Sequence, residues 1–162
     1  MAGKEVFFGD DQFIVSKTDT SGKIIYGNEI FIQISGYSEA ELLNQPHNIL
    51  RHPDMPATVY KHLWDRIKQK EEVFAYVINR TKDQDFYWVF AHITASLDDS
   101  NKIIAYHSVR RKPDMQALNA IKPLYQALQL AERSGGIHAG EALLNTELQK
   151  RKVTYDEFVL SL

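Results

Sequence analysis

The chain has 162 residues, 44% of them hydrophobic and 25% charged, which is typical of a soluble globular protein. It contains no cysteine, which excludes disulfides, thiolate metal sites, cysteine nucleophiles and a cysteine–flavin photoadduct. The formal net charge of −2 gives no electrostatic case for nucleic acid or an anionic membrane as a partner. No apolar run approaches the ~18 residues that span a bilayer, and no signal peptide is evident, so we expect a cytoplasmic protein.

The first part of the chain predicts a β-hairpin followed by short helices. Residues 12–19 and 23–26 are typical of two strands joined by a polar turn. Asn28 is a good helix N-cap, and Gly36 is a typical helix end. A capping box that begins at Ser38 predicts a second short helix.

The middle of the chain predicts one longer helix and three more strands. Pro56 suits the first turn of a helix that ends near Gln69. Polar turns separate the three expected strands, which cover residues 73–80, 86–97 and 103–110. Strands at both ends with helices between them predict an α+β fold, a five-stranded antiparallel sheet with short helices and one longer helix on one face.

The last third of the chain predicts a helical extension. Apolar residues from Ile121 to Leu128 recur at helical spacing, and Gly135-Gly136 interrupts the pattern. We expect a further helix over 142–151 and a short last helix capped by Thr154. The chain thus divides into three parts: an N-terminal cap, 1–11; a sensor domain, 12–112; and a C-terminal helical signalling or packing extension, 113–162.

Specific motifs follow the first helix. The sequence reads SGYS at 35–38, QPHN at 45–48 and RHPDMP at 51–56. With these motifs, the chain resembles the PAS family, and within it the flavin-binding sensor domain of bacterial aerotaxis receptors. The resemblance covers roughly residues 12–140, and the RHPDMP run with the preceding QPHN is its most specific part.

The resemblance implies a module that binds FAD non-covalently and reports cellular redox state to a chemotaxis signalling complex. The flavin-linked positions that it implies are Asn28, Arg51, His52, Asp54, Tyr60, Trp64 and Asn79, with His47 as a further candidate in the same motif. The membrane-spanning, HAMP and kinase-control segments of those receptors are absent from these 162 residues. We therefore expect the signal to pass to a separate chemoreceptor or kinase-control component, with a homodimer as a further option. The family's tryptophan at the start of the third strand is replaced by Val73, which predicts a pocket that is roomier or binds the flavin less tightly.

Side-chain chemistry agrees with a flavin site. Val73, Ala75 and Val77 alternate on one face of the third strand and leave room for a planar ring. Asn79, at the end of this set, can donate to and accept from the ring edge, and Arg51 can hold phosphate oxygens. Taken singly, an asparagine such as Asn79 more often only ends a strand, and an arginine such as Arg51 is more often solvated or ion-paired at the surface.

The sequence also bears on three other functions. We expect no enzyme, because no nucleophile–base pair, P-loop, GxGxxG or HExxH motif is present. A cofactor-free dimerisation or docking module is one alternative. A haem-binding gas sensor is another, since one axial histidine suffices, although the spacing of His47 and His52 is poor for a metal.

The same alternation predicts the other face of the sheet. Large apolar residues would point outward there: Phe74, Tyr76, Ile78, Trp88 and Phe90. A bare patch of that size is unusual on a soluble monomer. We therefore predict that the first dozen residues, the stripe from Ile121 to Leu128, or a second copy covers it, and that the redox signal leaves the module through this interface.

Overall fold

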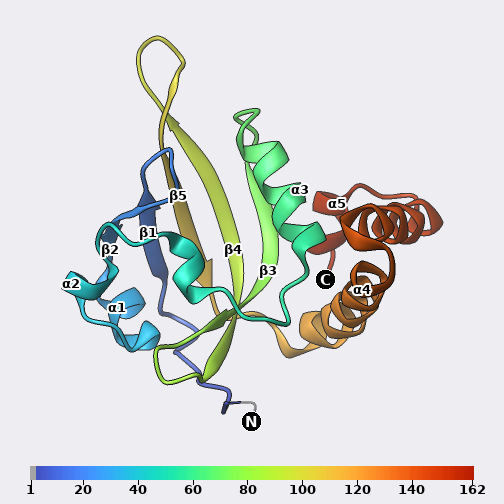
Figure 1. Ribbon diagram of the computed structural model, residues 1–162, viewed down its shortest axis with the longest axis horizontal. Coiled ribbons are helices and arrows are strands. Elements are labelled where there is room, and N and C mark those ends of the chain that lie inside the picture. Colours follow the sequence, from blue (N-terminus) through green and yellow to red (C-terminus); the bar gives the residue numbers. More distant parts are fainter. Residues whose placement is uncertain (1–2) are drawn as a thin grey trace.

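A computed structural model describes residues 3–162. Its core is one antiparallel sheet of five strands in the spatial order β2-β1-β5-β4-β3 (Figure 1). The strands are β1 Ile14–Thr18, β2 Ile24–Gly27, β3 Val73–Arg80, β4 Phe86–Leu97 and β5 Ile103–Arg111. The predicted α+β fold, with helices packed on one face of a five-stranded sheet, is confirmed.

The helices between β2 and β3 begin and end where the capping residues predict. They are α1 Glu29–Ser35, α2 Glu39–Leu42, the 3-10 helix η1 His47–Leu50, and α3 Ala57–Ile67. Asn28 caps α1, and Gly36 ends it at a φ of 76°. Ser38 forms the predicted capping box with Glu41. The longer helix α3 ends at Ile67, two residues before the expected Gln69.

The strand register confirms the predicted alternation. Asn79 lies opposite Tyr87, and Val77 lies opposite Val89, so these residues share the face that the helices cover. Tyr76 lies opposite Phe90 on the other face. We call these two sides the inner face and the outer face of the sheet.

Two helices follow the sheet, α4 Met115–Arg151 and α5 Tyr155–Leu160. Gly136 is the one non-helical residue inside α4, with φ 72° and ψ −167°. The predicted break at Gly135-Gly136 is confirmed as a kink at Gly136, and the helix expected over 142–151 is present but begins earlier, immediately after that kink. Thr154 caps α5 as predicted.

The chain's own ends cover the outer face next to β3. The Trp88 ring lies 6.0 Å from the Tyr125 ring of α4, and the Tyr125 hydroxyl donates to the Tyr76 carbonyl at 2.5 Å. Near the N-terminus, Val6 donates its backbone N–H to Phe86. Trp88 and Phe90 are 8% and 9% exposed, so the prediction that this surface is covered is confirmed.

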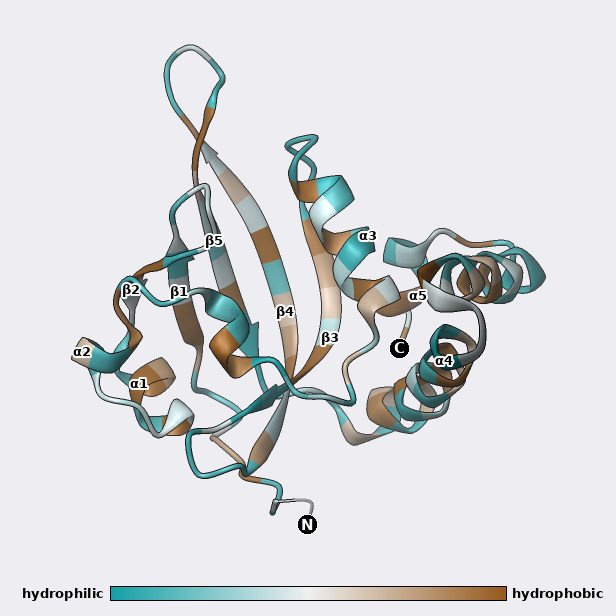
Figure 2. Cartoon of the chain, in the orientation of Figure 1, coloured by the Kyte–Doolittle hydropathy of each residue, from teal (hydrophilic) through white to brown (hydrophobic). Residues whose placement is uncertain are grey.

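The C-terminal helices also flank the edge of the sheet. Figure 1 shows α4 and α5 beside α3 and β3, where β3 is the last strand. A covered edge strand cannot pair with another chain. In Figure 2, β3 is largely hydrophobic, whereas the tip of the β4–β5 hairpin, which protrudes from the fold, is hydrophilic. Among residues 3–162, no helix is both long and apolar enough to cross a membrane.

Candidate functional site

A cavity of about 460 Å³ lies between α3, η1 and the inner face of the sheet. This volume is within the usual range for a small-molecule site, about 300 to 1,000 Å³. Its walls come from the motif segment, α3, strands β1, β3, β4 and β5, and one residue of α4. Those that matter below are Ser16, His47, Arg51, Tyr60, Trp64, Asn79, Tyr106, Ser108 and Ile137.

The RHPDMP segment is attached to the sheet at the cavity. Arg51 forms an isolated antiparallel bridge with Asn79, the penultimate residue of β3. The guanidinium carbon of Arg51 lies 4.3 Å from the centroid of the Tyr60 ring. Arg51 is exposed, so its charge lies at the rim of the cavity in contact with water.

Asn79 and Tyr87, which face each other on β3 and β4, each carry a buried side-chain atom that forms no hydrogen bond of ordinary geometry. Asn79 is 4% exposed, and its amide nitrogen forms no hydrogen bond. The Tyr87 hydroxyl, opposite it on β4, is also buried and unpaired, and burial raises the pKa of Tyr87 to about 12. Because leaving a buried donor unpaired costs about 1 to 3 kcal/mol, the amide nitrogen of Asn79, which lines the cavity, is suited to a ligand that pairs with it.

His47 is held neutral at the end of the cavity. Its Nε2 lies 3.1 Å from the Ser16 hydroxyl. Burial, and then the positive charge of Arg110, lower the pKa of His47 to about 3. The imidazole therefore serves as an uncharged hydrogen-bonding wall near neutral pH.

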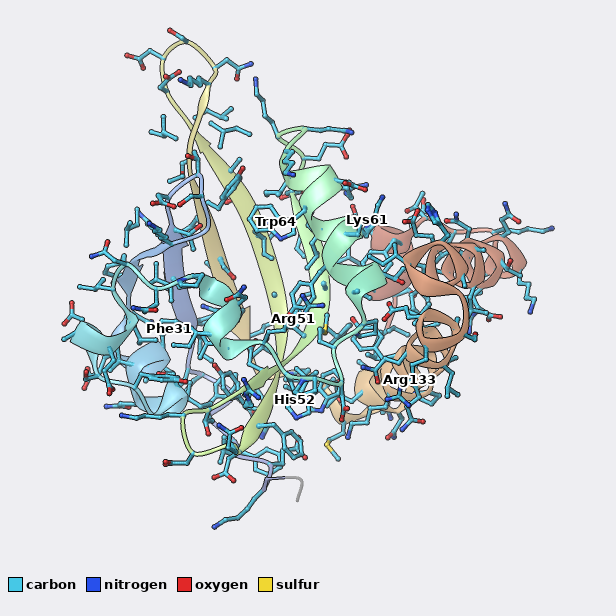
Figure 3. The ribbon with its side chains drawn as sticks, in the orientation of Figure 1. Phe31, Arg51, His52, Lys61, Trp64 and Arg133 are labelled. Carbon is cyan, nitrogen blue, oxygen red and sulfur yellow. The ribbon has the colours of Figure 1, made fainter. Side chains whose placement is uncertain are left out.

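Aromatic rings form the apolar part of the wall. Trp64 meets Tyr106 edge to face, with ring centroids 5.3 Å apart. Trp64 is nevertheless 41% exposed, and the Lys68 ammonium lies 6.0 Å from the centroid of its ring. Figure 3 shows Trp64 and Arg51 on the side of the sheet where α3 lies. Such walls suit a flat ring system.

Three of the predicted site residues do not line the cavity. The side-chain amide of Asn28 binds backbone groups. Its Oδ1 accepts from the N–H groups of Val15 and Phe31, and its Nδ2 donates to the Phe13 carbonyl. It is a helix cap with no free hydrogen-bonding group directed at a ligand.

The other two residues belong to the motif itself. The His52 ring lies edge-on to Phe86, and its Nδ1 accepts from the backbone of Asp54. Asp54 is an exposed carboxylate 3.9 Å from that ring nitrogen. Figure 3 places His52 away from Trp64, toward the lower end of the molecule. The remaining five predicted residues, His47, Arg51, Tyr60, Trp64 and Asn79, come together around the cavity.

Five residues of the site were not predicted. Four of them lie at inward positions of β1 and β5, where alternation would have identified them: Ser16, Tyr106, Ser108 and Arg110. Ile137 has no such signal, because α4 brings it to the cavity from 57 positions beyond Arg80 only through the tertiary fold.

The donor set fits a flavin better than a metal. Flat aromatic walls, an unpaired amide at one edge and a cation at the rim match a heteroaromatic ring with an anionic tail. Among residues 3–162, no group of three or more histidine or acidic side chains is placed to hold a metal ion.

Comparison with known families identifies the fold. A family model described as "PAS fold" matches residues 24–110, more than half of the chain. The chain belongs to the PAS family. It is a PAS sensor domain similar to those of signalling proteins.

Two curated relatives are similar in sequence. The aerotaxis receptor of Escherichia coli (strain K12) is 39% identical over 131 residues, 81% of this chain and 26% of the receptor. The nitrogen fixation regulatory protein of Klebsiella oxytoca is 32% identical over 97 residues, 60% of this chain and 20% of that protein. The chain thus spans about a quarter or less of the length of these relatives.

Solved structures share the fold. A light-oxygen-voltage domain studied with a flavin analogue superposes with a TM-score of 0.59 at 22% identity, covering 67% of this chain and 82% of that one. The light-state light-oxygen-voltage domain of Aureochrome1 has a TM-score of 0.60 at 18% identity, covering 68% and 88%. At these identities the likeness concerns the fold alone.

Proposed function

We propose that this chain is a cytoplasmic redox- or energy-sensing module that binds FAD non-covalently and is not an enzyme. The observation that carries the proposal is the buried, unpaired amide nitrogen of Asn79 in a cavity of about 460 Å³. The similarity to an aerotaxis receptor and the flavin analogue of a structural neighbour support it. FAD, when bound, would supply electron exchange with a cellular pool.

The residues around the cavity have distinct roles in this proposal. Asn79 pairs with the polar edge of the ring, and Tyr60 and Trp64 lie against its apolar part. Arg51, at the exposed rim, holds phosphate oxygens with its planar fork of donors, and a dinucleotide has two phosphates to offer. Asn28, His52 and Asp54 hold the backbone that positions these contacts.

The C-terminal extension, 113–162, is proposed to carry the signal away. Pro56 offers no side-chain cap to α3, and Glu132 of α4 takes that role. Its carboxylate accepts from the backbone of Ala57 at 3.2 Å and of Thr58 at 2.8 Å, and from the Thr58 hydroxyl at 2.7 Å. Ile137 of the same helix lines the cavity. A change at the flavin thus has a short route to α4, and from there to a chemoreceptor or kinase-control partner.

The absorption spectrum of the purified full chain tests the cofactor. We expect a yellow protein that absorbs near ~450 nm, with FAD identified by chromatography after release. A sharp Soret band would show a haem protein instead. A colourless protein that takes up no added FAD would favour a cofactor-free docking module.

A matched pair of variants tests the location. Ser108→Tyr places a ring in the cavity and should abolish flavin uptake, whereas the adjacent Val109→Tyr lies on the outer face and should not. Thermal unfolding of both variants checks that each is folded. Equal uptake by the two folded variants would contradict the proposed cavity.

A further inference from the structure

Arg110 is a buried cation without a counter-ion. It lies on the inner face of β5, opposite Ala91 and Ile14, and is 3% exposed. None of the ion pairs formed by residues 3–162 includes it. A buried charge is normally paired, because taking an unpaired ion out of water costs several kcal/mol.

The contacts of Arg110 are all neutral. One terminal nitrogen donates to the Ser16 hydroxyl at 2.5 Å, and the other lies 3.5 Å from Nε2 of His47. The guanidinium carbon lies 5.1 Å from the centroid of the Phe31 ring. The Nε donor is buried and has no partner.

The charge persists at physiological pH. Burial lowers the pKa of Arg110 to about 10, with Tyr87 and Tyr60 opposing this shift, so the group stays protonated near pH 7. The titratable groups that face Arg110 carry no negative charge near pH 7 that would compensate the guanidinium. The pKa of His47 is lowered to about 3, and those of Tyr60 and Tyr87 are raised to about 12.

The two arginines of the site lie in different surroundings. Arg51 is exposed at the rim, where hydrated phosphates can remain close to water. Arg110 lies behind Ser16 and His47, which both line the cavity. The deep end of the cavity is where a ring system is removed from water, so the field of Arg110 acts on the ring.

We propose that Arg110 is a positioning residue for redox chemistry: its buried charge, which acts through Ser16 and His47, compensates a negative charge that the ring acquires on reduction. This inference rests on the flavin binding proposed above. Reduction then takes two electrons from a small-molecule reductant and one proton from solvent, and the reduced ring keeps one negative charge. While the ring is oxidised, the buried charge of Arg110 has no compensating negative charge. Reduction supplies that negative charge.

The experiment is a potentiometric titration of the FAD-loaded full chain with dithionite between pH 5.0 and 6.5, where free reduced flavin still keeps the proton that the anionic form lacks. One proton for two electrons gives a slope of about 30 mV for each tenfold change in proton concentration. Uptake of two protons gives twice that slope. The groups named above do not titrate in this range. A wild-type slope near 60 mV would overturn the proposal whatever the variants do.

Variants sharpen the result. Arg110→Gln should weaken binding of reduced flavin relative to oxidised flavin at least tenfold, which lowers the potential by about 30 mV or more, and should double the pH slope. Arg110→Lys keeps the charge and should restore both values in part. Arg111→Gln is the matched control, because Arg111 lies opposite Phe90 on the outer face.

The outcomes separate the two proposals. A wild-type chain that takes up no flavin contradicts the proposed function. Flavin uptake with an unchanged potential and slope in folded Arg110→Gln contradicts only the role of Arg110. If Arg110→Gln does not fold, the wild-type slope and Arg110→Lys still decide.

Discussion

The inner and outer faces of β3 and β4 are built from the same two strands, yet only one face is complete in itself. On the outer face, Trp88 and Tyr76 are covered by Tyr125 of the chain's own α4. On the inner face, Asn79 and Tyr87 keep buried polar atoms without partners. The difference shows that a sheet can be covered by its own chain on one side and keep unpaired polar groups on the other.

The largest expected effect on stability lies on the outer face, which α4 covers. Leu128→Ala removes a fully buried side chain of α4 and should lower the free energy of unfolding by about 2 to 5 kcal/mol. Leu130→Ala, at a site that is 64% exposed on the same helix, should change it by about 0.5 kcal/mol or less. Chemical denaturation measures both. Similar losses in the two variants would show that the packing of α4 on the outer face contributes little to the free energy of unfolding.

The second effect concerns FAD retention and lies at the rim of the cavity, on the inner face of the sheet. Arg51→Ala should lose FAD more severely than Trp64→Phe, because hydrogen bonds to a charged group contribute about 1.5 to 3 kcal/mol. Trp64→Phe keeps an aromatic ring in place. Flavin-to-protein ratios after purification measure the difference, and equal retention would count against the role given to Arg51.

The third effect is a pH dependence of stability. The pKa of His47 is about 3 in the folded protein, against an ordinary value of 6.5. Between these values the unfolded chain binds a proton that the folded protein excludes, so stability falls as the pH falls. From pH 7 to pH 5, the free energy of unfolding should fall by about 2 kcal/mol because of His47.

His47→Asn should remove that part of the pH dependence, as measured by denaturation at the two pH values. His138→Asn changes an exposed histidine on α4 and is the control. Parallel pH profiles for the wild type and His47→Asn would show that His47 is not kept neutral by the fold.

A fourth effect separates stability from binding. Asn79→Leu removes unpaired polar atoms, so the flavin-free protein should be as stable as the wild type or more so. Its affinity for FAD should fall by about 1 to 3 kcal/mol, because the ring edge loses its partner. Calorimetric titration with FAD and denaturation of the flavin-free protein give the two numbers. Unchanged affinity and potential would refute the assignment of Asn79.

The smallest expected effect concerns the cap of α3. Glu132→Gln weakens charge-assisted bonds at a helix N-terminus and should cost about 0.5 to 2 kcal/mol. Amide hydrogen exchange at Ala57 and Thr58 should accelerate. Glu147→Gln alters a surface carboxylate on the same helix and should leave these two amides unchanged.

Local signals in the sequence account for most of the fold. Alternation along β3 and β4 predicted both faces, and the caps at Asn28 and Ser38 placed two helices correctly. These signals act over a few residues, so they can be recognised without the tertiary structure.

The site was harder to predict because one residue type serves two purposes. Asn28 matches a position linked to flavin binding, but its amide oxygen caps α1 and its amide nitrogen donates to the backbone of Phe13. An arginine near the end of a strand is ordinary in a sequence. Arg110 is unusual because it is buried and none of the ion pairs of the described residues includes it. Glu132 and Ile137 reach the site through the tertiary fold, over separations that no periodic pattern covers.

The cap that Glu132 provides also bears on the order in which the chain is made. Thr58 and Glu132 are 74 positions apart, so the start of α3 has no cap until α4 has been synthesised. Since chains begin to fold from the N-terminus during translation, the sheet can form while α3 still lacks its last hydrogen bonds. The helix that borders the cavity is therefore among the last parts to become ordered, and the cavity wall, which includes Ile137, is not complete until the C-terminal third of the chain has left the ribosome.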